Sequence, residues 1–519
     1  MAGLAPDRLS LRITLGLLGV LLASFTSGLN EYVAANAFMD IRGNLYIGYD
    51  EGSWLSACYS AAQVSAMAFA PWCSYTFSIR RFTMFCIGAL AVLGFLCPFA
   101  PDLPALFVLR TLQGLMAGCL PPMLMTVALR FLPAGVRLYG LGAYAFTATF
   151  TPNIAVPLAA LWTGYASWEW AFWQAIPLCT VACLLVGYGL PQDPLHLERF
   201  EKFDTVGLLT GLPGLCMVIL GLLKGDHYNW FDSPLIFMLI VGGCGLLVAF
   251  FINEWTHPVP FFRLDILRRR NFTHALLTLP GVLIMMGVII EVPNQYLSHI
   301  HGYRPLESAP LMLMVALPQL AGLVLVAALC NLPRVDCRWV LAAGISCCAL
   351  TCLGFSYLDT DWTRHNFYAL MALQIVGQPM AIIPLLMLAT GAVVPAEGVF
   401  ASSWFNTTRG ISSVFEHSLL SYLVTDRGRF HSDVMTGQLG DAPQNLALYL
   451  ETLPYGGHVA DPAAGLQVLA RQIHEQVLVL TLSDVFWFML PIASLLLLLI
   501  TVIPSRIYPP SVPSPVPAA

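Results

Sequence analysis

Charged residues are scarce in this chain. Only 10% of its 519 residues are Asp, Glu, Lys or Arg, whereas 58% are hydrophobic, and the mean hydropathy is +0.74. A soluble domain covers its core with a polar surface, for which about 25% charged residues are usual. The scarcity of charge excludes a soluble globular protein and indicates that lipid is the solvent of this chain.

The sequence also lacks the motifs of nucleotide chemistry and of metal binding. It contains no P-loop, no glycine pattern of a dinucleotide fold and no nucleophile elbow, so ATP hydrolysis and hydride transfer have no support. Its 14 cysteines form no CxxC pair, which argues against a zinc site or a disulfide framework. We expect no catalytic residues, no cofactor, no metal and no nucleic-acid partner, which leaves an ion gradient as the energy source.

What the chain has in abundance is long apolar runs. A run of about 18 to 25 apolar residues spans the ~30 Å hydrocarbon core as a helix, because backbone groups at that depth must be bonded within the segment. We predict fourteen spans, although the short separator at 395–398 also allows thirteen. They are 13–36, 54–77, 82–100, 104–129, 138–162, 170–190, 205–223, 234–252, 273–297, 308–330, 339–358, 367–392, 398–425 and 480–503.

Positive charge predicts the orientation of these spans. With a cytoplasmic N-terminus, fifteen Lys and Arg residues fall inside and seven outside, and three of those seven belong to one long external loop. Loops rich in Lys and Arg stay in the cytoplasm, so both termini are predicted to be cytoplasmic. Two further arginines, Arg110 and Arg409, fall within predicted spans.

Polar segments divide the spans into groups of six, two and six. We predict an all-α polytopic membrane protein with an N-terminal six-helix bundle at 1–190 and a linker with two extra transmembrane helices at 191–272. A C-terminal six-helix bundle follows at 273–505, including an external loop at 427–479, and a disordered cytoplasmic tail at 506–519 ends the chain. The external loop is too long for a simple connector, which indicates a function.

Short motifs in the spans resemble a known transporter family. Residues 106–118, in which Arg110 is followed by Gln113-Gly114, resemble the fourth-helix signature of major facilitator superfamily antiporters. Further matches are Gly43-Asn44-Leu45 with Trp54, Trp168-Glu169-Trp170-Ala171-Phe172, Phe203-Asp204, Asn406-Thr407-Thr408-Arg409-Gly410 and Ser483-Asp484-Val485-Phe486. In this order and spacing they resemble the fourteen-spanner drug:proton antiporter family, specifically its EmrB/QacA-type multidrug exporters, over nearly the whole chain.

The chain departs from this family at two motifs. Residues 71–81, between the second and third spans, lack the aspartate of the family's Gly-x-x-x-Asp-Arg-x-Gly-Arg-Lys. The fifth-helix motif Gly-Pro-x-x-Gly-Gly is present only as Ala155-Val156-Pro157-Leu158-Ala159-Ala160. Alanines still permit close helix approach, and Pro157 removes a backbone donor and can bend the helix. Antiport is therefore suggested by the resemblance and not established by the motifs.

The resemblance implies a major facilitator fold and proton-coupled efflux of amphiphilic or hydrophobic small molecules across a bacterial inner membrane by alternating access. One alternative is transport, in either direction, of a specific metabolite such as a siderophore or a fatty acid; another is an integral-membrane enzyme or sensor centred on Glu416 and His417. Besides substrate, protons and membrane lipid, the resemblance implies a periplasmic adaptor protein and an outer-membrane channel as partners.

Charged side chains inside spans are the candidates for proton coupling, because they are costly there unless they face water or a partner. Glu31, beside the Asn30 position where relatives commonly place an aspartate, is the leading proton carrier, although a solvated position at the outer end of the span is the alternative. Arg110 could modulate the charge state of Glu31 or bond the backbone of a neighbouring helix.

A second group of ionisable residues lies in the thirteenth span, at Glu416 and His417. Histidine titrates near neutrality, which suits a second protonation site or a polar lining of the substrate path. The alternative is a buried pair satisfied by Ser412, Ser413 or another helix. Glu291, in the ninth span, is interpreted as a solvated residue at the rim.

A cavity for varied amphiphilic substrates needs apolar and aromatic surface with a few polar anchors. The predicted lining is drawn from polar and aromatic residues of several spans. It comprises Asn30, Trp54, Tyr59, Phe146, Asn153, Gln319, Gln374, Gln378, Trp404, Phe405, Asn406 and Arg409.

Overall fold

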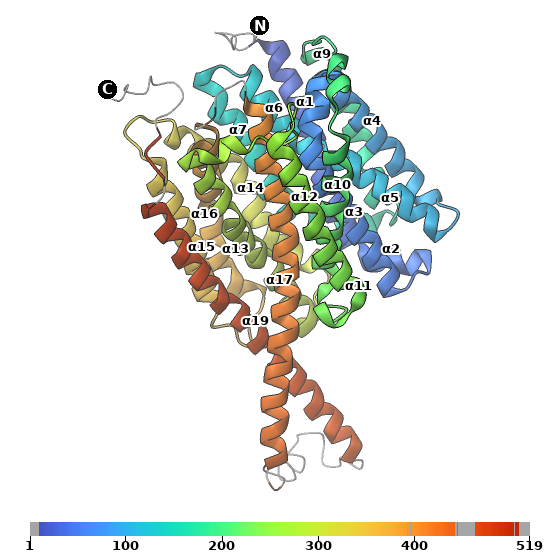
Figure 1. The fold of residues 1–519 in the computed structure, drawn as a ribbon. Helices are drawn as coiled ribbons and strands as arrows, with labels where there is room; N and C mark the ends of the chain where they lie inside the picture. Colours follow the sequence, from blue (N-terminus) through green and yellow to red (C-terminus); the bar gives the residue numbers. More distant parts are fainter. Residues whose placement is uncertain are drawn as a thin grey trace.

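The computed structural model is a bundle of long helices that run side by side (Figure 1). It describes residues 10–391, 393, 397–441, 444, 462–502 and 504–507, and no strand occurs among them. The first half contains α1 (Leu11–Asn36), α2 (Phe38–Leu45), α3 (Tyr49–Phe77), α4 (Ile79–Leu96), α5 (Leu103–Gly118), α6 (Leu120–Phe131), α7 (Ala134–Tyr165), α8 (Trp170–Trp173) and α9 (Ala175–Gly189). Next come the short helix η2 (Leu197–Lys202), α10 (Thr205–Gly225), η3 (Trp230–Asp232), α11 (Pro234–Phe237) and α12 (Gly243–Thr256). The second half contains α13 (Arg270–His301), α14 (Pro305–Cys330), α15 (Cys337–Phe355), α16 (Arg364–Gly391), α17 (Gly398–Asp441) and α19 (Pro462–Val502).

Eleven helical segments among the described residues are long and apolar enough to span a membrane. α3, α7 and α17 are also long, with 29, 32 and 44 residues, but no stretch of span length in them is as apolar as in the eleven. They pack within the bundle, α3 against α5, α7 against α14 and α17 against α13. These segments coincide with the fourteen predicted spans. The predicted all-α polytopic fold is confirmed, and the chain is a multi-pass membrane protein.

The helices form two halves that meet along a central seam. In the first half α1 packs against α7 and α9, and α3 against α5; in the second, α15 packs against α16, and α13 against α17 and α19. Contacts of α14 with α7 and of α17 with α3 join the halves. α10 packs against α12 and also against both α3 and α17, so the extra pair of helices lies at the seam.

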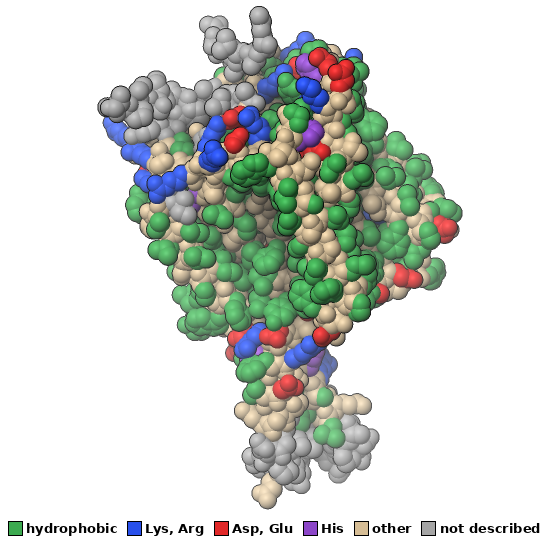
Figure 2. Space-filling view, viewed as in Figure 1, with side chains coloured by type: hydrophobic (Ala, Val, Ile, Leu, Met, Phe, Trp, Pro, Cys, Tyr) green, Lys and Arg blue, Asp and Glu red, His purple; other side chains and the backbone are tan. Residues whose placement is uncertain are grey.

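The surface of the bundle is consistent with a lipid environment. Hydrophobic side chains cover its flank, whereas most Lys, Arg, Asp and Glu side chains visible in this view gather toward the two ends (Figure 2). α1 begins and α19 ends at one end of the bundle, here called the termini end, and the opposite end is called the hairpin end (Figure 1). An even number of spans places both termini on one side in this way.

The hairpin end differs from the sequence prediction. The external segment 427–479 is predicted as a loop, but α17 continues to Asp441 and α19 already begins at Pro462, so its described parts are helical. The two helices project together beyond the bundle (Figure 1). Asp484 joins them, because its carboxylate accepts a hydrogen bond from Arg427 Nε at 2.7 Å and lies 2.8 Å from His431 Nε2.

The tail prediction also needs one correction at its start. Arg506 donates a hydrogen bond to the Pro333 carbonyl at 2.9 Å, and Ile507 packs against the hydrophobic core. These two residues are held against the bundle by this contact, although the predicted disordered tail begins at 506. The rest of the tail, from residue 508, lies outside the described residues.

Candidate functional site: a polar cavity between the halves

A cavity of about 640 Å³ lies between the two halves. Residues of α1, α3, α7, α13 and α17 form most of its wall, and it extends to Lys224, Asp226 and His227 toward the hairpin end. At the termini end α17 is closed against the first half, because Ser402 Oγ donates to the Pro122 carbonyl at 3.0 Å and Ser403 Oγ to the Ala68 carbonyl at 3.3 Å. These contacts hold α17 against the first half on the termini side of the cavity.

All four predicted proton-coupling residues line this cavity: Glu31, Arg110, Glu416 and His417. The bundle thus brings side chains from α1, α5 and α17 to one space. Charged groups in a bundle interior are stable when they face water or each other, which a shared polar cavity provides.

Glu31 is held in place by α3. Its Oε2 accepts a hydrogen bond from Gln63 Nε2 at 2.9 Å, while the guanidinium groups of Arg110 and Arg409 are close enough to act on its charge. Gln63 is only 3% exposed and its own Oε1 has no hydrogen-bond partner among the described residues. The carboxyl group of Glu31 is therefore positioned by an amide and lies in the field of two cations.

Two glycines of α5 allow the helix that carries Gln63 to come close. A Cβ atom at Gly114 would overlap the Tyr59 carbonyl, and one at Gly118 would overlap the Gln63 carbonyl. Small residues permit this backbone approach in membrane helices. These two glycines therefore set how closely α5 and α3 pack beside the cavity.

Arg110 is 4% exposed and has no carboxylate partner among the described residues. It donates to Gln113 Oε1 at 2.7 Å and lies 4.2 Å from the ring centre of Tyr59 and 5.2 Å from that of Phe172. An amide and two aromatic faces thus solvate the cation. The structural role considered for Arg110 was a hydrogen bond to the backbone of a neighbouring helix. Its partners here are side chains instead.

A second arginine links the two halves. Arg409 of α17 donates to the hydroxyl oxygen of Tyr144, on α7, at 3.1 Å. The same hydroxyl donates to Asn406 Oδ1 at 2.9 Å. This network crosses the seam between the halves beside the cavity.

Glu416 lies opposite α13. A Cβ atom at Gly287 would overlap the Glu416 carboxyl group, so the glycine makes room for it. Glu291 lines the same cavity and acts electrostatically on Glu416. The hydroxyl groups of Ser412 and Ser413 donate to backbone carbonyls one turn earlier in α17. These two hydroxyl groups therefore do not bond Glu416; the other part of the alternative interpretation, a partner on another helix, stays a prediction.

Three of the predicted cavity residues, Tyr59, Gln378 and Arg409, line the central cavity. The others lie outside its lining: Asn30, Trp54, Phe146, Asn153, Gln319, Gln374, Trp404, Phe405 and Asn406. The amides among them are 0% exposed and are hydrogen-bonded to protein groups, and Phe146 and Phe405 pack against other rings. Buried amides need such partners, and the sequence does not reveal which of them also face a cavity.

The two tryptophans of that set lie near opposite ends of the bundle. Trp54 Nε1 donates to the Tyr228 hydroxyl oxygen at 3.2 Å, in the group that borders the cavity at the hairpin end. Trp404 Nε1 donates to the Arg263 carbonyl at 3.1 Å near the termini end.

Sequence reasoning missed a charged cluster at the hairpin end. Lys224 of α10, 2% exposed, bonds Ser53 and lies 3.4 Å from Asp50 Oδ1, both at the start of α3. Asp226 accepts hydrogen bonds from Ser421 and Thr425 of α17, each at 2.8 Å. The end of α10 therefore bridges the two halves. The available signal was the Lys-Gly-Asp-His run at 224–227, directly after the seventh predicted span.

The arrangement defines the class of protein. A bundle of two six-helix halves encloses a polar cavity with four carboxyl groups, at Glu31, Glu291 and Glu416 and, toward the hairpin end, Asp226. The cavity lies at the seam, where rocking of the halves can expose one site alternately to the two sides of a membrane. This is the architecture of a secondary transporter.

The chain belongs to the Major Facilitator Superfamily, whose family model matches residues 20–415. It is similar to the multidrug export protein EmrB of Escherichia coli (strain K12), with 23% identity over 481 residues that cover 90% of each chain. It is also similar to the fatty acid resistance protein FarB of Neisseria gonorrhoeae, with 26% identity over 79% of this chain and 80% of FarB. The resemblance to EmrB-type transporters predicted from the motifs is confirmed.

Solved structures support the fold. The proton:xylose symporter XylE, solved with 6-bromo-6-deoxy-D-glucose, matches with a TM-score of 0.53 and 12% identity over 92% of this chain and 96% of XylE. At this identity the likeness concerns the fold alone. The predicted major facilitator fold is confirmed.

Proposed function

We propose that this protein exports amphiphilic or hydrophobic small molecules in exchange for protons, by alternating access across a bacterial inner membrane, with both termini in the cytoplasm. The observation that carries the proposal is the placement of Glu31 in the cavity between the halves, bonded by Gln63 and in the field of Arg110 and Arg409. The names of the relatives EmrB and FarB, which are a multidrug export and a fatty acid resistance protein, support export over uptake.

The cavity supplies both parts of such an exchange. Glu31 carries the proton: its ionised form is stabilised by Gln63 and the two arginines, and protonation removes its charge and weakens those contacts. One proton moving down ~100 mV yields about 2.3 kcal/mol, enough to help concentrate a lipophilic compound outside. Apolar and aromatic wall residues such as Tyr32, Met67 and Met286 offer adaptable contact surface for varied substrates.

Glu416 is the second proposed proton site, with His417 beside it on the cavity wall. Glu291 faces the same space, so two carboxyl groups of like charge lie near each other without a basic partner recorded for either among the described residues. Export of a specific metabolite such as a fatty acid is the second candidate function, which the similarity to FarB favours.

The test uses purified protein in liposomes with an imposed pH gradient. We expect Glu31→Gln to fold, because glutamine keeps an oxygen that accepts from Gln63, and to retain substrate counterflow. Accumulation driven by the pH gradient should fall to the level of empty liposomes. Glu198→Gln, at an exposed position of η2, is the matched control and should transport normally.

Gradient-driven transport by the Glu31→Gln variant would remove Glu31 from the coupling mechanism. Glu416→Gln in the same assay separates the two sites. If it shifts the pH dependence of transport without abolishing coupling, Glu416 has an auxiliary role. Dyes, uncouplers, fatty acids and siderophore-like compounds as substrates distinguish multidrug export from transport of one metabolite.

The projecting hairpin of α17 and α19 is the proposed docking site for a periplasmic adaptor. α17 has 44 residues, or about 66 Å at 1.5 Å per residue, roughly twice the ~30 Å needed to cross the hydrocarbon core. Apolar side chains remain exposed on the projecting part, at Phe430 (50%), Val434 (43%) and Leu466 (49%). An adaptor that leads to an outer-membrane channel would cover this surface.

A further inference from the structure

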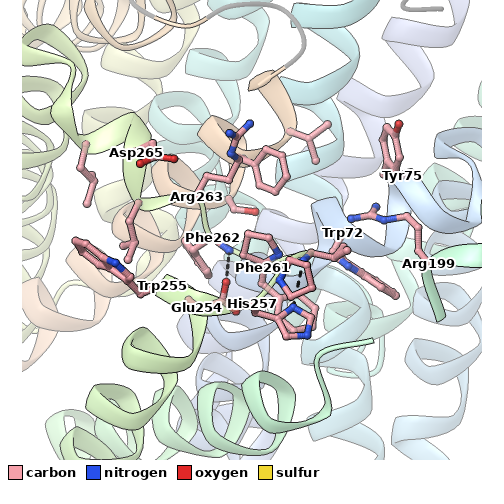
Figure 3. A pocket seen from close by; sticks show the side chains of 18 of the residues that line it. Trp72, Tyr75, Arg199, Glu254, Trp255, His257, Phe261, Phe262, Arg263 and Asp265 are labelled. Carbon is pink, nitrogen blue, oxygen red and sulfur yellow. Dashed lines mark hydrogen bonds between the residues drawn. The ribbon is translucent and has the colours of Figure 1, made fainter. Parts of the chain in front are cut away.

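A second cavity, of about 850 Å³, lies at the termini end of the bundle. The end of α3, η2, the segment that joins α12 to α13, and the start of α17 surround it. Figure 3 shows its side chains converging from these elements. None of its lining residues lines the central cavity, so this is a separate space with its own chemistry.

Three guanidinium groups line this second cavity, and none has a carboxylate partner among the described residues. The guanidinium of Arg199 lies over the rings of Trp72 and Tyr75, 5.1 and 4.8 Å from the ring centres. It also donates a long hydrogen bond, of 3.5 Å, to the hydroxyl oxygen of Thr76. Burial lowers the pKa of Arg199 below its ordinary value. A guanidinium remains charged nonetheless, so each group can still bind an anion.

Arg263 and Arg268 are the other two cations of this lining. The guanidinium of Arg263 lies 5.6 Å from the ring centre of Phe400. Neither arginine makes a hydrogen bond or an ion pair through its side chain within the described part of the chain. Guanidinium groups bind phosphate oxygens with paired N–H donors, and this geometry favours phosphate over a halide or a single carbonyl.

The same cavity also offers a buried acceptor. Glu254 is 3% exposed; its Oε2 accepts the Phe262 N–H at 2.9 Å, as the dashed line in Figure 3 shows. Its Oε1 meets no N–H or O–H donor among the described residues, and the Asp204 carboxylate lies beside Glu254. A buried carboxylate oxygen is stabilised by an N–H or O–H donor, so a ligand with both phosphate and a donor group satisfies the two sides of the cavity.

The wall also contains aromatic side chains and reaches the flank of the bundle. Phe261 and Phe262 are buried, whereas Trp255 is 73% and Tyr75 47% exposed. Tryptophan and tyrosine gather where lipid meets water, because their rings are apolar and their tips are polar. α12 ends and α13 begins beside this cavity, so the arginines lie at the depth of lipid headgroups.

We propose that this second cavity binds the headgroup of a membrane phospholipid that carries a hydrogen-bond donor beside its phosphate, as phosphatidylglycerol and phosphatidylethanolamine do. The phosphate contacts Arg263 with Arg199 and Arg268 around it. The headgroup hydroxyl or ammonium donates to Glu254 Oε1, and the acyl chains lie along Trp255. Asp265, the other carboxylate of the lining, is exposed and faces the same headgroup region.

Native mass spectrometry of the full-length protein in detergent, titrated with single lipids, tests the proposal. We expect phosphatidylglycerol and phosphatidylethanolamine to bind about tenfold more tightly than phosphatidylcholine, whose headgroup has no donor. Arg263→Gln should weaken both preferred lipids by about tenfold. Glu254→Gln, which still accepts from Phe262, should reduce the preference over phosphatidylcholine.

The matched control is Arg42→Gln, at the opposite end of the bundle, where Arg42 lies over the Tyr49 ring. It should leave lipid binding unchanged. Equal binding of all three lipids, or normal binding by Arg263→Gln, would overturn the proposal. A last titration uses glycerol phosphate, which has no acyl chains, as a competitor of lipid binding. If it displaces the lipids at concentrations similar to theirs, the site binds a soluble phosphate compound instead. Because lipid binding is measured without transport, the result does not depend on the function proposed above.

Discussion

At the scale of single residues, Gln63 connects helix packing to the charge in the cavity. Its backbone carbonyl is where α5 approaches α3 at Gly118, and its side-chain amide bonds Glu31. A change at the glycine is therefore transmitted to the carboxyl group through one residue. Packing and the proposed proton coupling cannot be altered independently at this position.

Gly118→Ala tests this connection. The added methyl group overlaps the Gln63 carbonyl, and overpacking of this kind costs about 1–3 kcal/mol. We expect a lower thermal unfolding temperature and slower gradient-driven transport. Gly88→Ala in α4 is the control, because a Cβ atom there meets nothing within 4 Å. Equal behaviour of the two variants would show that α5 can move away from α3 without cost.

Arg110→Lys tests the role of the guanidinium. An ammonium keeps the charge but cannot reach Gln113 while lying flat against the Tyr59 ring. We expect transport to fall by about tenfold or more, which corresponds to the loss of a charge-assisted hydrogen bond of about 1.5–3 kcal/mol. Transport rates over a range of pH check this result. If the variant keeps the wild-type rate and pH profile, Arg110 serves packing alone.

The ionisable residues could be identified from the sequence, whereas their surroundings could not. Glu31 and Arg110 are conspicuous because charge inside an apolar run is costly. Gln63 is an uncharged side chain in a helix with many small residues, and nothing local marks it as the partner of Glu31. That pairing depends on the rotation of α1 and α3 about their axes, which long-range packing determines.

At the scale of elements, the extra pair of helices has a structural role at the seam. The end of α10 bonds α3 through Lys224 and α17 through Asp226. The two halves are therefore tied together beside the mouth of the cavity at the hairpin end. Any rocking of the halves must stretch or break one of these two connections.

Asp226→Ala should loosen this tie. It removes the acceptor of two hydrogen bonds, from Ser421 and Thr425, worth about 1–3 kcal/mol together at a partly exposed site. We expect faster backbone hydrogen exchange in α17 around residues 418–428, measured by mass spectrometry. Asp232→Ala, in the exposed turn η3, should leave exchange in that segment unchanged. Unchanged exchange in both variants would assign the bridging role to Lys224 alone.

The spans themselves were predictable because hydrophobic length is a local property of the sequence. The projecting hairpin was not. Its residues are polar enough to exclude a membrane location, and length and polarity together favoured a loop. The helical conformation continues there because α17 and α19 support each other through Asp484, which contacts both Arg427 and His431. Such a contact joins residues more than fifty positions apart.

At the scale of the whole molecule, the hairpin is the part that reaches farthest from the membrane-embedded bundle (Figure 1). Deletion of residues 436–468 leaves Arg427, His431 and Asp484 in place. With a short Gly-Ser linker in its stead, transport in liposomes should be preserved, while resistance of intact cells should be lost. Resistance assays in cells with two membranes, alongside liposome transport of the same variant, provide the measurement.

The outcome distinguishes three roles for the hairpin. Loss of resistance alone supports docking of an adaptor. Survival of both activities contradicts it, and loss of both means that the hairpin stabilises the fold. A variant in which the same segment is replaced by a Gly-Ser linker of equal length controls for the shortening itself.

One continuous helix, α17, carries Arg409 and Glu416 at the cavity and ends at Asp441 in the projecting hairpin. From Glu416 to Asp441 the helix extends about 37 Å at 1.5 Å per residue. It acts as a lever arm: a tilt of about 10° at the cavity, of the size seen in domain rocking, moves its tip by about 6 Å. A protein bound at the tip would therefore be displaced in each transport cycle, without any contact with the substrate.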